Sequence, residues 1–124
     1  MAIVLKVLGN NVIGTSGSTP AELLTTYSGG TPPNAVPTGK AIIVKNIRFV
    51  NRDTVKRTVT INYLPGGSNA RAVSPSGVAI LPGGLLILDE ELILGAGDKL
   101  QAVLGETSTG SVIDFVVGGV ERDQ

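Results

Sequence analysis

The alternation of apolar and polar residues predicts β-structure, most clearly in two neighbouring runs between residues 40 and 64. In the second run, TVTINYL, apolar Val59 and Ile61 alternate with threonine and asparagine, as in a strand with one buried face. The first run, residues 40–50, is apolar on both faces. One face carries Ile43, Ile47 and Phe49, and the other carries Ile42, Val44 and Val50. The two runs flank a short polar turn and predict a central antiparallel hairpin.

Shorter apolar runs separated by glycine and proline predict the remaining strands. They lie at residues 2–9, 23–27, 78–81, 85–88, 92–94, 99–104 and 111–120. Residues 21–27 could instead open as one helical turn capped by Ser18 or Thr19. A helix over 84–94 is a second alternative, but the glycines on both sides favour a strand, an acidic turn and a strand.

The segments between these runs have the composition of turns and loops. Leu-Pro-Gly-Gly occurs at 64–67 and again at 81–84, and Pro-Gly suits the central positions of a type II turn. We expect Asp98, in a Gly-Asp turn, to hydrogen-bond its own turn backbone. Residues 28–39, rich in Pro and Gly, predict a surface loop or an extended arm, and 65–77 a second long loop.

This pattern predicts an all-β fold, an antiparallel β-sandwich or jelly roll of about eight strands. The 124 residues fit a single domain over 1–124, in which 1–20 could form an N-terminal strand and arm. Hydrophobic residues make up 42% of the chain and aromatic residues only 3%, so the core must be aliphatic. We expect the inward-facing positions to include Val59, Ile61, Leu100, Ala102, Ile113 and Phe115.

The charges are segregated along the sequence, although the net charge is zero. Residues 1–71 contain eight Lys and Arg residues and two acidic residues, a net charge of +6. Residues 72–124 contain two Lys and Arg residues and eight acidic residues, a net charge of −6. Three interpretations remain open. The region could bind a polyanion, strands from the two halves could pair and neutralise each other, or a basic patch on one copy could meet an acidic patch on the next.

The composition argues against catalysis. Histidine and cysteine are absent, which removes the commonest general base and the commonest soft metal ligands. Asp89, Glu90 and Glu91 form the densest carboxylate group, but neighbouring strand residues point to opposite faces, so we expect a solvated turn. Gly39-Lys40 fails the phosphate-loop pattern, because Asn34 and Ala41 occupy two required positions. We expect no enzymatic activity, no metal and no cofactor.

The sequence also argues against nucleic acid and membrane as partners. A basic cluster surrounds the predicted hairpin turn and consists of Lys45, Arg48, Arg52, Lys56 and Arg57. The aromatic residues on which bases stack are scarce, however. No apolar run approaches the length needed to span a bilayer.

The sequence predicts self-association. Residues 42–44 and 85–88 are apolar on both strand faces, whereas a two-layer sandwich buries only one face of each sheet. Copies of the same chain are the best cover, although the residues do not distinguish a dimer from a trimer. The candidate interface joins apolar and charged positions: Ile42, Val44, Arg48, Arg52, Lys56, Arg57, Asp89, Glu90 and Glu91.

Several segments resemble small bacteriophage virion structural proteins of the capsid decoration, cement or head-fibre type. They are Lys6-Val7-Leu8-Gly9, Leu24-Thr25-Thr26-Tyr27, Val36-Pro37-Thr38-Gly39-Lys40 leading into Ile42–Val50 with Asn51-Arg52, and Leu92-Ile93-Leu94-Gly95-Ala96-Gly97-Asp98. The chain departs from that pattern in its longer loop at 65–77 and its more apolar run at 84–94.

The resemblance implies a β-sandwich that decorates a phage capsid. Its partners would be the major capsid protein lattice and its own copies, with a trimer favoured because virion surface proteins sit at threefold sites. The protein would be made in the host cytoplasm and lie on the virion surface. The alternative is a receptor- or carbohydrate-binding module of a phage tail or fibre.

Overall fold

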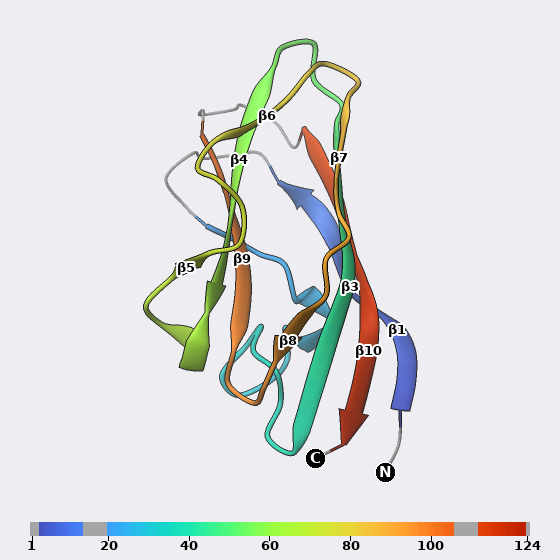
Figure 1. Ribbon diagram of the computed structural model, residues 1–124, viewed down its shortest axis with the longest axis vertical. Coiled ribbons are helices and arrows are strands. Elements are labelled where there is room, and N and C mark those ends of the chain that lie inside the picture. The colour runs from blue at the N-terminus through green and yellow to red at the C-terminus, as the bar shows by residue number, and fades with distance from the viewer. Residues whose placement is uncertain (1–2, 14–19, 106–111, 124) are drawn as a thin grey trace.

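The chain folds as an all-β sandwich of two antiparallel five-stranded sheets (Figure 1). The computed structural model describes residues 3–13, 20–105 and 112–123. Sheet A contains β1 (Ile3–Ile13), β3 (Lys40–Asn51), β7 (Leu85–Leu88), β8 (Leu92–Leu94) and β10 (Ile113–Asp123). Sheet B contains β2 (Ala21–Glu22), β4 (Arg57–Leu64), β5 (Arg71–Ala72), β6 (Val78–Ile80) and β9 (Lys99–Leu104).

The strand order is that of a jelly roll in which two edge strands are interrupted. Sheet A runs β1-β10-β3, with both β7 and β8 paired to β3, and sheet B runs β2-β9-β4, with both β5 and β6 paired to β4. Each interrupted pair counts as one strand, which reduces the ten strands to the eight of a jelly roll. The predicted sandwich is confirmed, and β7, the acidic turn and β8 form the predicted strand, turn and strand along one edge. The predicted central hairpin is wrong, because β3 lies in sheet A and β4 in sheet B, so the turn between them crosses from one sheet to the other.

One predicted strand is wrong. Residues 23–27 leave the sheet after the two-residue β2 and form the 3₁₀ helix η1 (Thr25–Tyr27), a second one being η2 (Pro65–Gly67). Leu23, Leu24 and Tyr27 are nevertheless buried, because this segment packs against β1 and covers the gap between the edge strands of the two sheets. Their apolar character therefore indicated burial rather than a strand. The proposed caps Ser18 and Thr19 lie outside the described residues.

The core lies between the sheets and is aliphatic around one aromatic pair. Phe49 and Phe115 pack with their ring centroids 6.3 Å apart. All six residues predicted to face inward are buried, none more than 2% exposed: Val59, Ile61, Leu100, Ala102, Ile113 and Phe115.

Two β-bulges flank a Gly-Gly pair in the central strand β10. On one side Gly118 and Gly119 pair with Asn46 and Val44, which leaves Lys45 of β3 without an opposing residue. On the other side Leu8 of β1 is the extra residue. A Cβ atom on Gly119 would lie 2.2 Å from the Ile43 carbonyl oxygen, so glycine permits this close approach.

The bulge in β3 changes which residues share a face. Because Lys45 is extra, the alternation shifts by one residue, and Ile42 and Val44 join Ile47 and Phe49 on the inner face. The predicted division of this strand into two apolar faces is therefore wrong. Its outer face carries Ile43, and beyond the bulge it continues with Arg48 and Val50.

The turn chemistry follows the sequence. Gly66 and Gly83 have φ angles of 64° and 70°, as the third position of a type II turn requires. Asp98 accepts a hydrogen bond from the Gly95 amide at 2.8 Å, which confirms the predicted contact with its own turn. It also accepts one from the Gly66 amide at 2.9 Å and so ties two distant turns together.

The two oppositely charged halves of the chain neutralise each other. Four ion pairs join residues 1–71 to residues 72–124: Lys6–Glu121, Lys40–Asp123, Lys45–Glu91 and Arg52–Asp114. The interpretation in which strands of opposite charge meet is therefore confirmed. Among the described residues, no helix is long and apolar enough to cross a membrane.

Candidate interface on the outer face of sheet A

The outer face of sheet A carries most of the exposed apolar surface in the described chain. Of the ten large hydrophobic side chains exposed in residues 3–13, 20–105 and 112–123, seven lie on this face: Leu5, Val7, Val12, Leu85, Ile87, Ile93 and Val116. A solvated antiparallel sheet normally turns polar residues outward. This face has the composition of a surface that another protein covers.

A continuous apolar row crosses the sheet from one edge to the other. Ile93 of β8 lies opposite Ile43 of β3, Ile43 opposite Val120 of β10, and Val120 opposite Leu5 of β1. Directly opposed residues on one face have Cβ atoms about 5 Å apart, so these four side chains form one strip. Leu5 and Ile93, at the two edges, are 82% and 73% exposed.

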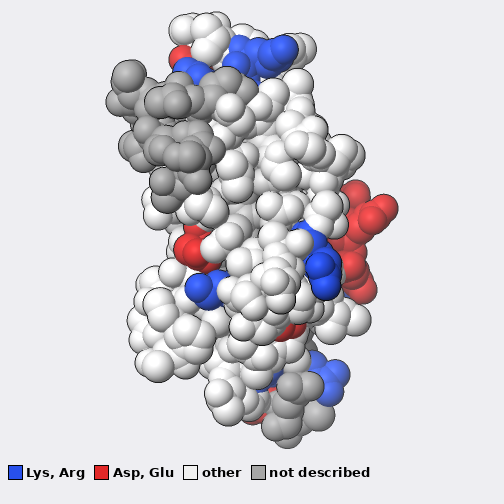
Figure 2. All heavy atoms as spheres, turned by 90° about the vertical axis from the view of Figure 1, so that its left-hand side faces the viewer, with Lys and Arg blue, Asp and Glu red and all other residues white. Residues whose placement is uncertain are grey.

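The outer face of sheet B is different. Its central strand β4 turns Thr58, Thr60 and Asn62 outward, and the neighbouring β9 turns out Lys99, Gln101 and Val103. Viewed from the side of sheet B, the surface shows charged side chains in a few scattered groups among mostly uncharged residues (Figure 2). Sheet B therefore has the polar outer surface of a sheet that faces water, and sheet A does not.

Two shallow grooves hollow the outer face of sheet A and share Val116. One, of about 310 Å³, is lined by Asn46, Arg48, Ile87, Asp89 and Val116. The other, of about 520 Å³, lies beside β1 and is lined by Val7, Asn10, Asn11, Val12, Asp114, Phe115 and Val116. The face is therefore contoured, with apolar walls and a small number of polar groups.

Arg48 and Asp89 are the charged residues of the first groove. Both are exposed, and neither makes an ion pair with another described residue. Asp114, in the second groove, is already paired with Arg52 at 2.8 Å. A binding partner could thus place an acidic group against Arg48 and a basic group against Asp89 without breaking an ion pair between described residues.

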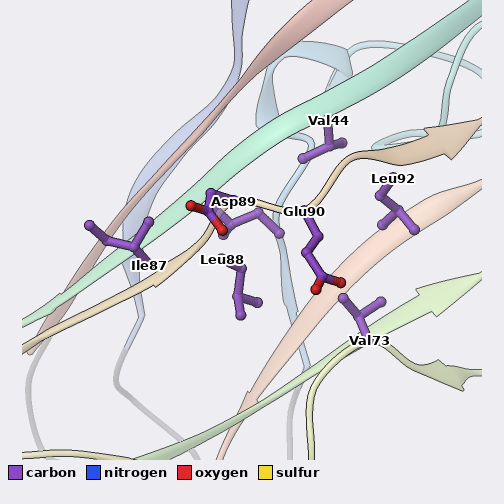
Figure 3. Close-up of a pocket in the computed structure, with 8 residues that line it drawn as sticks. Val44, Val73, Ile87, Leu88, Asp89, Glu90 and Leu92 are labelled. Atoms are coloured by element: carbon purple, nitrogen blue, oxygen red, sulfur yellow. The ribbon is translucent and has the colours of Figure 1, made fainter.

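A smaller cavity of about 160 Å³ lies where the interrupted edges of the two sheets face each other (Figure 3). Its walls are mainly aliphatic, with Val44 and Leu92 from sheet A and Val73 from the sheet B side. Asp89 and Glu90 lie at its rim, and their side chains point in different directions. No group of three or more His, Cys, Asp or Glu within the described ranges could hold a metal ion.

The structure separates the nine residues of the predicted interface. Ile42 and Val44 are 0% and 1% exposed and lie in the core, so an interface role for them is wrong. The physical reason is the bulge at Lys45, which turns both residues inward. Arg48 lies on the outer face of sheet A, with Asp89, Glu90 and Glu91 in the exposed turn beside it.

The basic residues after β3 lie at the end of the sandwich, where Arg52 reaches Asp114 at the margin of this face. Arg52 and Lys56 are exposed in the connection between β3 and β4, and Arg57 begins β4. Arg57 is ion-paired with Asp53, four residues earlier. The predicted basic cluster is therefore divided between the sheet face and the end of the sandwich.

A half-buried polar group lies beside η1. The Tyr27 hydroxyl donates to the Glu121 carboxylate at 2.5 Å, and the Lys6 ammonium lies 3.2 Å from the same carboxylate. Burial raises the pKa of the Tyr27 phenol, and the hydrogen bond to Glu121 raises it further. The same hydrogen bond holds the pKa of Glu121 below its ordinary value. These contacts fix β1, η1 and β10 to one another.

Comparison with known proteins finds the fold but no relative in sequence. No family model and no curated protein matches the chain. Chains in the structures of infectious bursal disease virus, strains Gt and Gx, are similar over 97% of this chain, with TM-scores of 0.51 and 0.50 and sequence identities of 10% and 11%. The chain spans about a third of the length of these neighbours (32% and 31%).

The likeness shows a β-fold shared with these chains from virus structures. A xylan-binding domain from Paenibacillus barcinonensis covers 95% of this chain at 11% identity, and this chain covers 80% of that domain. Its TM-score of 0.35 is too low for the likeness to carry an argument.

The sequence pattern missed the residues that define the outer face. Ile43, Ile93, Leu5 and Val120 are ordinary strand residues in the sequence, and only the pairing of four strands brings them into one row. The sequence did predict another part of this face. Residues 85–88 are apolar on both strand faces, and Leu85 and Ile87 lie outward in the structure.

Proposed function

We propose that this chain is a non-enzymatic structural protein of a bacteriophage particle, a capsid decoration or cement protein on the virion surface. It would bind and stabilise the lattice of the major capsid protein. The observation that carries the proposal is the apolar outer face of sheet A, because a sheet with both faces apolar belongs in an assembly.

Two further observations support a place on a virus particle. The fold is shared with chains in the structures of infectious bursal disease virus, although at about a tenth sequence identity this concerns the fold alone. The segments that resemble phage virion proteins also fall on structural elements: Lys6–Gly9 includes the β1 bulge, and Gly95–Asp98 is the turn tied to Gly66.

The experiment is immunogold electron microscopy of purified phage particles with antibodies against the recombinant chain. A regular array of label over the head is the expected result. Label confined to one vertex would overturn decoration in favour of the tail or fibre module, and unlabelled particles would overturn the virion assignment.

The stabilising role needs its own measurement. Capsids that lack the protein should release their DNA at a lower temperature than complete particles, and adding back the recombinant chain should restore the higher temperature. Serum albumin at the same concentration is the control. A release temperature that does not respond to the added chain would contradict the cement role.

A further inference from the structure

We infer that the outer face of sheet A is covered by the same face of a second copy of this chain, which gives a dimer with two-fold symmetry. The inference goes beyond the proposed function, because it concerns the isolated protein and holds whether or not the chain belongs to a virion. The second copy would cover the apolar row and the groove beside it. The row consists of Leu5, Val120, Ile43 and Ile93.

The size of the face fits a stable dimer. Four neighbouring strands spaced about 4.8 Å apart, with 12 residues in the longest, β3, cover roughly 750 Å². A standard interface buries about 800 Å² on each partner. The face is therefore comparable in area to one side of a standard interface, and a second copy of the same face could cover it.

The charges on the face are complementary to themselves. Arg48 and Asp89 line one groove, are exposed, and make no ion pair with another described residue. A two-fold axis that lies in the plane of the interface, midway between these two side chains, places Arg48 of each copy beside Asp89 of its partner. Two charge pairs would then form at the centre of the interface, where an opposite charge fixes the register of the two faces.

The geometry favours a dimer over a trimer. When one surface patch packs against the same patch of another copy, the operation that relates them is a two-fold axis, and the assembly closes at two. A trimer requires two different patches on each chain. The apolar surface of the described residues is concentrated on one face, and the outer face of sheet B carries threonine, asparagine and glutamine.

The first experiment measures the mass of the purified chain in solution by light scattering after size exclusion, at concentrations from 0.1 to 100 µM. The expected mass is twice the 12.7 kDa of one chain. Ile93→Lys should raise the dimer dissociation constant at least about tenfold. The matched control is Leu81→Lys, which changes a side chain of similar exposure, 65% against 73%, in the turn before β7, and should leave the dissociation constant unchanged.

The second experiment reverses the charges in the groove. Arg48→Glu should weaken the dimer at least about tenfold, because two acidic side chains then meet across the axis. The double reversal Arg48→Glu with Asp89→Arg should restore it, since each new charge again meets its opposite on the partner. Arg71→Glu, on β5 of sheet B, is the control of equal charge change.

Far-UV circular dichroism checks that every variant keeps its β-structure. A monomeric or trimeric native chain would overturn the inference, as would equal weakening by Ile93→Lys and Leu81→Lys. If the double reversal leaves the dimer as weak as Arg48→Glu alone, the pairing of Arg48 with Asp89 is refuted. A monomer that still labels phage heads would refute the dimer while leaving the proposed function intact.

Discussion

Asn51, the last residue of β3, is expected to hold the two sheets together at one end of the sandwich. Its side chain is fully buried, and its amide nitrogen donates to the Ile80 carbonyl of β6 at 2.9 Å and to the Val55 carbonyl at 3.0 Å. Its side-chain oxygen accepts from the Asp53 amide at 2.9 Å. One side chain thus joins sheet A to sheet B and closes the turn between β3 and β4.

The magnitude for Asn51→Ala follows from these three hydrogen bonds. Each is worth about 0.5–1.5 kcal/mol net, and a buried acceptor left without a donor costs more, about 1–3 kcal/mol. In Asn51→Ala the Ile80 carbonyl would lose this donor while buried, because Ile80 is only 2% exposed. The Val55 carbonyl and the Asp53 amide lie nearer to water. We expect a loss of about 2–4 kcal/mol in the free energy of unfolding, a large part of the total stability of a small domain.

Urea denaturation followed by far-UV circular dichroism measures this loss. Asn62→Ala, on the outer face of sheet B, is the matched control and should cost about 0.5 kcal/mol or less. Asn51→Asp tests the same contacts by their pH dependence. At pH 7 the new carboxylate would face two carbonyl oxygens, which repel it. The loss in the free energy of unfolding relative to wild type should therefore become smaller as the pH falls and the carboxylate is protonated. If Asn51→Ala costs less than about 1 kcal/mol, the side chain does not hold the sheets together.

Two further changes test the Tyr27–Glu121–Lys6 group and the bulges. Hydrogen bonds from Tyr27 and Lys6 hold the pKa of Glu121 low, so its carboxylate stabilises the fold above its unfolded pKa, and this contribution is lost as pH falls through the lower folded pKa. The melting temperature should therefore fall less between pH 7 and pH 3 in Glu121→Gln than in wild type, and equal declines would contradict this role. Gly119→Ala should cost about 1–3 kcal/mol in urea denaturation, because its Cβ would meet the Ile43 carbonyl oxygen at 2.2 Å. Gly29→Ala, which meets nothing within 4 Å, should be nearly neutral, and a similar cost for both would refute the steric argument.

The sequence by itself determined the β class, the turns and most of the core. These features depend on local physics: the period of two in a pleated strand, and the backbone angles that Pro-Gly pairs adopt. Val59 and Ile61 therefore point inward as predicted, and Gly66 and Gly83 occupy the predicted turns. The segregated charge left three interpretations open in the sequence, and pairs such as Lys6–Glu121 show that strands of opposite charge meet within the chain.

Only the tertiary structure decided the faces of β3 and the location of the apolar surface. A β-bulge adds one residue and inverts the alternation beyond it, and nothing in the local pattern of residues 40–50 marks Lys45 as the extra one. Ile42 and Val44 therefore became core residues, and Ile43 moved to the outside. The row of Leu5, Val120, Ile43 and Ile93 joins strands up to 115 positions apart in the chain. Such a surface exists only after the strands have paired, because its members share no local pattern.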